Sequence, residues 1–248
     1  MPIEIRSTKD VGSDGIKCLV FGKAGIGKTT LMRTAPRPIV LSCESGLLAL
    51  KNFDIPYIEI KTMEDLNEAF EFLNENDDYA TVCLDSITEI AQVLLTELLE
   101  EYKDPRQAYG ELSNQMSNVI RLFRDMKGKN VIFSAQRTRI TDDDTNTTTY
   151  LAAMPGKTLL NSLPFFFDEV FYMTTEIDDE GVEYRVLKTT ADFGYDAKDR
   201  SGELDKDEVP DLSIIFKKIA GVYEAPAKKA AKKSITKKKK ASEESAEA

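Results

Sequence analysis

The chain has 248 residues, of which 42% are hydrophobic and 31% charged, so it is long enough to bury a core and has the composition of a soluble globular protein. Its three cysteines fall in or beside apolar runs and it has no histidine, which argues against a disulfide framework, a zinc site and a histidine-based triad. No apolar run approaches the roughly 18 residues of a membrane span, and the first residues lack a signal-peptide core. We therefore expect a cytoplasmic protein with no membrane contact.

The net charge of −10 is unevenly distributed along the chain. Residues 225–248 carry eight lysines and three glutamates, which leaves −15 for residues 1–224. An acidic body attracts nucleic acid poorly, so any such contact must come from a local patch or from the tail. We expect residues 224–248 to be disordered, because alanine, lysine, serine and glutamate leave almost nothing to bury. The lysines either tether a polyanion or only keep the protein soluble.

The sequence GKAGIGKT at residues 22–29 follows an apolar run at 16–21 and precedes a short helix-compatible segment that Pro36 ends. Its spacing fits G-x-x-x-x-G-K-[ST], in which Lys28 reaches the β- and γ-phosphates and Thr29 offers a hydroxyl to Mg²⁺. The alternative is a glycine-rich turn with a surface lysine, which the flanking strand and helix disfavour. We therefore expect a bound nucleoside triphosphate. The expected contacts are Gly22, Lys23, Ala24, Gly25, Ile26, Gly27, Lys28, Thr29 and Thr30.

Strands and helices alternate along the rest of the chain. Residues 3–5 could form an edge strand, and apolar runs predict buried strands at 16–21, 39–42, 57–60, 81–84 and 131–135. Helical spacing of apolar residues predicts helices at 63–73, 87–102, 112–126 and 212–219. The order predicts an α/β fold with a mainly parallel twisted sheet flanked by helices.

Two strands at 169–175 and 183–189 predict a β-hairpin that extends this sheet. The polar, threonine-rich segment 137–157 predicts either a β-hairpin or a mobile loop, and we expect 191–210 to be irregular. The predicted organisation is an N-terminal extension at 1–15, one domain at 16–223 and the tail at 224–248.

Polar residues follow the predicted strands at the edge of the sheet where ligands collect. Asp85 ends the strand 81–84, where a phosphate loop needs an acidic residue to hold Mg²⁺ or its water, although Asp85 would also cap the next helix. Gln136 ends the strand 131–135, and its amide either binds a γ-phosphate or its attacking water, or faces a loop.

Hydrolysis also needs a group that activates water. Many hydrolysing proteins with this loop place a glutamate directly after the metal-binding aspartate, but here that position is Ser86. Glu44 lies two residues past the strand 39–42, at the carboxyl edge of the sheet, and we favour it for this role. Glu89 is the other candidate, and it could equally complete a capping box for its helix.

This order of phosphate loop, Glu44, Asp85, Gln136, polar loop and hairpin resembles the RecA-like ATPase core over about residues 16–219. The run LPFFFDEV at 163–170 resembles phage-borne nucleotide-binding or single-strand-annealing recombination proteins. The resemblance implies ATP and Mg²⁺ as ligands, with metal support from Asp85 and water activation by Glu44. It also implies that Gln136 couples the γ-phosphate to the loop that follows.

The resemblance further implies that the loop 137–157 contacts DNA through Arg137, Arg139 and Lys157. Lys188 resembles a lysine that reaches the nucleotide of a neighbouring subunit; the family usually has a second lysine two residues on, where this chain has Thr190. The alternative for Lys188 is a solvated strand lysine.

The sequence thus predicts an ATPase that acts on single-stranded DNA in recombination or annealing, in bacterial or phage-infected cytosol. Its expected partners are further copies of itself and a single-strand-binding or replication protein. One alternative is a nucleotide-switched loader or assembly factor that works through protein partners. A less favoured one is a small-molecule P-loop kinase.

Overall fold

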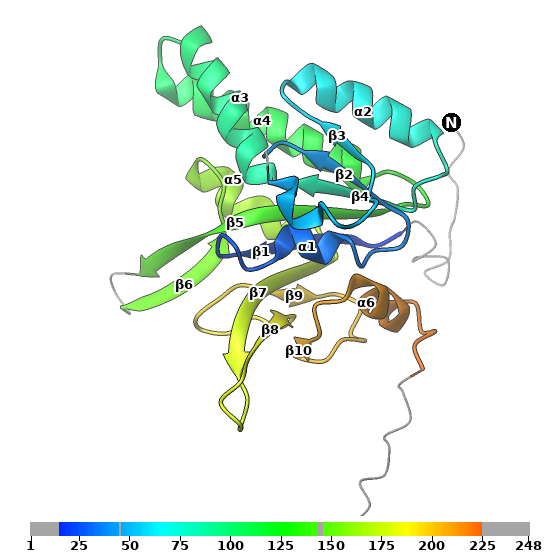
Figure 1. Cartoon of the computed structure of the whole chain (residues 1–248). Coiled ribbons are helices and arrows are strands. Elements are labelled where there is room, and N and C mark those ends of the chain that lie inside the picture. Colours follow the sequence, from blue (N-terminus) through cyan, green and yellow to red (C-terminus); the bar gives the residue numbers. More distant parts are fainter. Residues whose placement is uncertain (1–14, 45, 143–145, 225–248) are drawn as a thin grey trace, which may run out of the picture.

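A computed structural model describes residues 15–44, 46–142 and 146–224 (Figure 1). The expected edge strand at 3–5, the extension up to residue 14 and the lysine-rich tail from residue 225 lie outside the described residues.

One mixed sheet runs through the described part of the chain in the order β10-β8-β7-β1-β5-β4-β2-β3, with β6 paired to β5 and β9 paired to β7. The strands are β1 (Lys17–Gly22), β2 (Pro38–Ser42), β3 (Tyr57–Glu59), β4 (Thr81–Asp85), β5 (Asn130–Asp142), β6 (Thr147–Ala152), β7 (Glu169–Ile177), β8 (Glu183–Lys188), β9 (Lys198–Asp199) and β10 (Asp207–Glu208). The six strands from β7 to β3 pair in parallel, so the predicted α/β fold with a mainly parallel sheet is confirmed.

Helices cover both faces of this sheet (Figure 1). They are α1 (Lys28–Met32), α2 (Met63–Glu75), α3 (Ile87–Glu101), α4 (Pro105–Arg124), α5 (Lys157–Ser162) and α6 (Leu212–Ile219), with single 3₁₀ turns at Leu47–Leu50 and Leu163–Phe166. Alternate side chains of β1 divide between two cores: Leu19 and Phe21 pack with α2, α3, α4 and α5, whereas Val20 packs with α1 and α6. No helix in the described residues is long and apolar enough to cross a membrane.

Two helices differ from the prediction. Helix α4 begins at Pro105 rather than at residue 112, because Asp104 caps it by accepting the Arg106 N–H at 2.9 Å and proline suits the first helical position. Helix α5 was not predicted; it is short, and it follows Gly156, whose φ is +84°.

Two antiparallel ribbons extend from the strands on either side of β1 (Figure 1). Strand β5 runs on past Gln136 and pairs with β6, from Arg137 opposite Ala152 to Asp142 opposite Thr147. Of the two alternatives for the threonine-rich segment, its described residues therefore form the hairpin. The predicted hairpin of β7 and β8 is also confirmed, with Tyr172 opposite Lys188.

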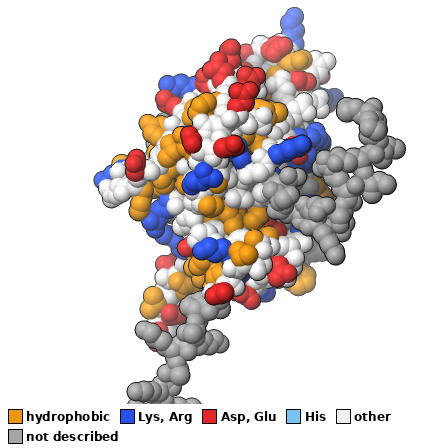
Figure 2. Space-filling model, turned by 90° about the vertical axis from the view of Figure 1, so that its right-hand side faces the viewer, with side chains coloured by type: hydrophobic (Ala, Val, Ile, Leu, Met, Phe, Trp, Pro, Cys, Tyr) orange, Lys and Arg blue, Asp and Glu red, His pale blue; other side chains and the backbone are white. Residues whose placement is uncertain are grey.

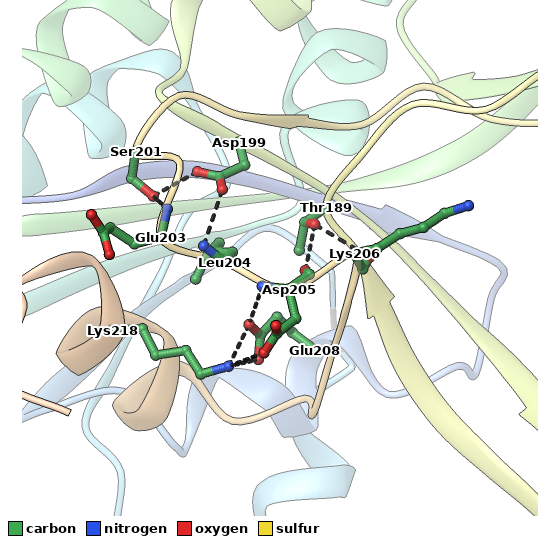
Figure 3. A network of polar contacts seen from close by, with 9 residues as sticks. All are labelled: Thr189, Asp199, Ser201, Glu203, Leu204, Asp205, Lys206, Glu208 and Lys218. Carbon is green, nitrogen blue, oxygen red and sulfur yellow. Dashed lines mark hydrogen bonds and ion pairs between the residues drawn. The ribbon is translucent and has the colours of Figure 1, made fainter. Parts of the chain in front are cut away.

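The segment between β8 and α6 is nearly as irregular as predicted, and polar contacts hold it in place (Figure 3). The Asp199 carboxylate accepts hydrogen bonds from the Ser201 hydroxyl at 2.6 Å and the Leu204 N–H at 3.1 Å. Lys218 of α6 pairs with Asp205 and with the buried Glu208, each at 2.7 Å. These contacts fasten α6 to the β10 edge of the sheet.

One face of the described surface mixes both signs of charge (Figure 2). On the face drawn in Figure 2, acidic, basic and apolar side chains are interspersed, and the described residues there form no continuous basic area. On this face, the body offers nucleic acid no broad electrostatic attraction.

Candidate active site

The loop at residues 22–29 joins β1 to α1 at the carboxyl edge of the sheet. Gly27 has a φ of +112°, a conformation that residues with a Cβ rarely adopt. Gly22 ends β1 opposite Met173 of β7, and a Cβ on Gly22 would lie 2.5 Å from the Met173 carbonyl oxygen. Both glycines are therefore required by the backbone itself.

Asp85 lies at the end of β4, directly behind this loop. One of its carboxylate oxygens accepts a hydrogen bond from the Thr29 hydroxyl at 2.6 Å, and the other accepts one from the hydroxyl of Ser134 on β5. A hydroxyl and a carboxylate at this distance supply the hard oxygen ligands that Mg²⁺ prefers. The residues present thus fit the metal, which Thr29 would bind and Asp85 would support directly or through its water.

The alternative role of Asp85 as a helix cap is wrong. Helix α3 is capped by Ser86, whose hydroxyl oxygen faces the Glu89 N–H at 3.4 Å. Glu89 thus occupies the third position of the helix, as a capping-box residue would.

The Ser86 hydroxyl also donates a hydrogen bond to the Glu44 carboxylate at 2.6 Å. Glu44 is half-buried and follows β2, whose last residue, Ser42, pairs with Asp85. Burial lowers the pKa of the Lys28 ammonium, and the negative charges of Asp85 and Glu44 oppose this effect without outweighing it, so both carboxylates lie close enough to act on the lysine. The serine that stands in the usual glutamate position therefore orients the glutamate of the neighbouring strand.

The thiol of Cys43 lies close to the same negatively charged carboxylates. Its pKa rises to about 12, first because the thiol is largely buried and then because Asp85, Glu44 and Glu89 disfavour a thiolate. Within the described residues the three cysteines are free, and Cys18 and Cys83 are fully buried, as expected for reduced thiols.

Gln136 lies directly beside the phosphate loop, because β5 pairs with β1 in a register that places it opposite Gly22. Its backbone N–H donates to the Thr88 hydroxyl at 3.0 Å, and that hydroxyl donates to the Ala153 carbonyl at 2.9 Å. The side chain of Gln136 is exposed. Its backbone is therefore fixed at the site while its amide remains accessible.

A model of the AAA domain matches residues 14–201 of the chain, and this range holds the phosphate loop together with Glu44, Asp85 and Glu89. The chain belongs to the AAA domain family. A comparison with curated proteins finds no match. Because it belongs to this family, the chain contains a P-loop NTPase domain, which indicates that it binds and hydrolyses a nucleotide. Members of the family usually use Mg²⁺ together with the nucleotide.

The cations expected to contact DNA occupy different environments in this AAA domain. The Arg137 guanidinium lies 4.3 Å from the ring centre of Tyr150 and donates to the Tyr172 hydroxyl at 2.8 Å, so it is partly committed within the protein. Arg139 is exposed on the β5–β6 ribbon, and Lys157 is exposed at the start of α5.

Lys188 is not a solvated strand lysine, because only 7% of the residue is exposed. Its ammonium pairs with Asp207 at 2.8 Å and with Glu176. Burial lowers its pKa, but the hydrogen bonds and charges of these two carboxylates outweigh that effect and raise it.

Three side chains at the site escaped prediction. Ser134 donates a hydrogen bond to Asp85, and Ser86 donates one to Glu44. Arg185 of β8 places its guanidinium over Gly27. A serine at the end of the otherwise apolar strand 131–135 was a usable signal for Ser134. Arg185 could not be found in this way, because its position depends on the register of the β7–β8 hairpin.

Proposed function

We propose that this AAA domain is a RecA-like, Mg²⁺-dependent ATPase that acts on single-stranded DNA in recombination or annealing. The observation that carries the proposal is the course of β5. This strand passes Gln136 beside the phosphate loop and continues without interruption into the ribbon that bears Arg139. A contact at the phosphates is thereby connected by one continuous strand to an exposed cation.

The chemistry follows from the residues around the loop. Lys28 would neutralise charge that develops on the γ-phosphate, and Glu44, oriented by Ser86, would accept the proton of the attacking water. Gln136 would hold that water or a γ-phosphate oxygen through its accessible amide. When bound, Mg²⁺ would supply further charge stabilisation at the Thr29 and Asp85 oxygens.

The test is the rate of ATP hydrolysis with and without single-stranded DNA, together with DNA binding at several salt concentrations. We expect DNA to raise the rate, and we expect binding to weaken steeply with salt. Arg139→Ala and Lys157→Ala should reduce the stimulation, while Arg200→Ala, which removes a cation from a surface ion pair with Asp168, should not. A wild-type protein that neither binds DNA nor responds to it would refute the DNA role.

The second candidate function is to act on protein partners. Two observations favour it: Arg137 already contacts Tyr150 and Tyr172 within the protein, and residues 1–224 are acidic. In that case the chain would be a nucleotide-switched loader or assembly factor in the cytosol of a bacterium or an infected host. A pull-down with wild type and Lys28→Ala separates the two: partners retained only with ATP and only by the wild type favour the switch. A kinase is disfavoured, since residues 137–142 and 147–152 form a threonine-rich ribbon in place of an arginine-rich lid.

The remaining roles concern self-association and a further protein partner. We propose that the protein works as a homo-oligomer and that a single-strand-binding or replication protein is a partner. For Lys188, a trans-acting role would require release from Glu176 and Asp207, so Lys188→Ala should change the nucleotide response only in the assembled form.

A further inference from the structure

A cavity of about 720 Å³ opens between the phosphate loop and the β7–β8 hairpin. The loop side is formed by residues 23–27, α1 contributes Thr30, and the hairpin contributes Thr175, Glu183 and Arg185. Glu44, Asp85 and Gln136 do not line this cavity. The cavity therefore lies along the phosphate loop but away from the residues to which we assign hydrolysis.

Arg185 faces the loop from the hairpin. Its Nε and Cζ atoms lie 3.6 Å from the position that a Cβ on Gly27 would take. The structure assigns the Arg185 side chain no hydrogen bond or ion pair with any described residue, whereas Lys188, on the same strand, is held by two carboxylates. Glu183 also lines the cavity, but it forms no ion pair with Arg185 in the described structure. An arginine that stands over a cationic loop without an ion pair gains little from the protein itself, and an anion placed between them would be attracted to both.

The position of Arg185 along the loop identifies the part of the nucleotide that it would meet. In loops of this type the backbone N–H groups cradle the α- and β-phosphates, the lysine reaches the β- and γ-phosphates, and the hydroxyl binds the metal. Arg185 lies over Gly27, a residue whose backbone forms part of this cradle, and it lines the same cavity as Thr30. Asp85 and Glu44, the carboxylates that act on Lys28, do not line the cavity.

We propose that Arg185 binds the α/β-diphosphate of the nucleotide held by its own chain, and that the cavity beyond it takes the nucleoside. The proposal rests on the nucleotide binding proposed above and adds a ligand contact from the β7–β8 hairpin. Because ADP and ATP share these phosphates, Arg185 contributes equally to the affinity for both.

The test is calorimetric titration of the full chain with ADP and with a slowly hydrolysed ATP analogue, both in Mg²⁺. Arg185→Ala should raise the Kd for both nucleotides about 10- to 100-fold and leave their ratio unchanged, as expected for the loss of a hydrogen bond to a charged group. Arg185→Lys should lose less, since it keeps the charge but not the planar fork. Arg106→Ala, which removes another exposed arginine, on α4 and outside this cavity, is the matched control and should bind like the wild type.

Three results would overturn the proposal. If Arg185→Ala binds ADP as the wild type does while Lys28→Ala binds ATP weakly, the loop binds nucleotide and the Arg185 assignment alone is wrong. If Arg185→Ala weakens only the ATP analogue, the arginine serves the γ-phosphate instead. A wild type that binds neither nucleotide refutes the proposed function and this assignment together.

Discussion

Glu44 follows β2 with its carboxylate 2.6 Å from the Ser86 hydroxyl, and Glu44→Gln changes its chemistry while preserving its shape. The glutamine oxygen still accepts the serine hydrogen bond, but an amide cannot take a proton from water. We expect the turnover number for ATP to fall about 10²- to 10⁴-fold, because that is the usual contribution of a general base. This corresponds to about 3–5 kcal/mol in the activation barrier.

The same substitution should barely affect folding. Replacing a charged acceptor by a neutral one weakens the hydrogen bond from Ser86 by about 1 kcal/mol. For a chain of this length, that lowers the midpoint of thermal unfolding by about 2–4 °C. A loss of activity measured at 25 °C would therefore reflect catalysis rather than unfolding.

The assay is phosphate release at saturating ATP and Mg²⁺, with nucleotide affinity and thermal unfolding measured on the same preparations. Glu59→Gln is the matched control, since Glu59 ends the neighbouring strand β3 beside Ser42 and is exposed. A Glu44→Gln protein within about threefold of the wild-type rate would refute the assignment. If Glu89→Gln were inactive instead, the catalytic role would move to Glu89.

Three further predictions concern the metal, the sheet and pH. Asp85→Asn should weaken nucleotide binding at least about tenfold in Mg²⁺ and leave metal-free binding unchanged, as titrations with and without Mg²⁺ would show; an equal loss in both would contradict the metal role. Gly22→Ala should cost about 1–3 kcal/mol in urea unfolding, because its Cβ would meet the Met173 carbonyl, whereas Gly110→Ala, with open space around it, should not destabilise. Burial and the charge of Asp199 raise the pKa of Glu169 to about 8, so its contribution to stability is present below about pH 4.5 and is lost as the pH rises to 8. Glu169→Gln should flatten this part of the pH dependence of the unfolding free energy, and an unchanged slope would contradict the assignment.

Much of the nucleotide site could be predicted because its signals are local. The loop motif needs only eight consecutive residues, and Asp85 and Gln136 each end a short apolar run. In parallel strands such ends meet at one edge, so Asp85 and Gln136 could be placed near the loop before the sheet order was known.

The parts that were missed depend on distant pairings. Arg185 reaches the loop only because the hairpin sets Thr175 opposite it and β7 pairs with β1. The burial of Lys188 likewise requires Asp207, which comes from β10. Strand lengths and registers of this kind follow from packing over the whole sheet and not from a local pattern. The start of α4 is a different case, since Asp104 followed by Pro105 was a readable start signal.

The continuity of β5 has a mechanical consequence. A strand rises about 3.3 Å per residue, so the arm from Gln136 to Asp142 extends about 20 Å beyond the phosphate loop. The paired β6 strand stiffens this arm, and the Thr88 hydroxyl holds its base. Because the arm is about 20 Å long, a tilt of the arm by about 10° at Gln136 would move Asp142 by about 3.5 Å. A displacement at the loop that is too small to disturb the sheet would thus become large enough at Asp142 to break or make a hydrogen bond.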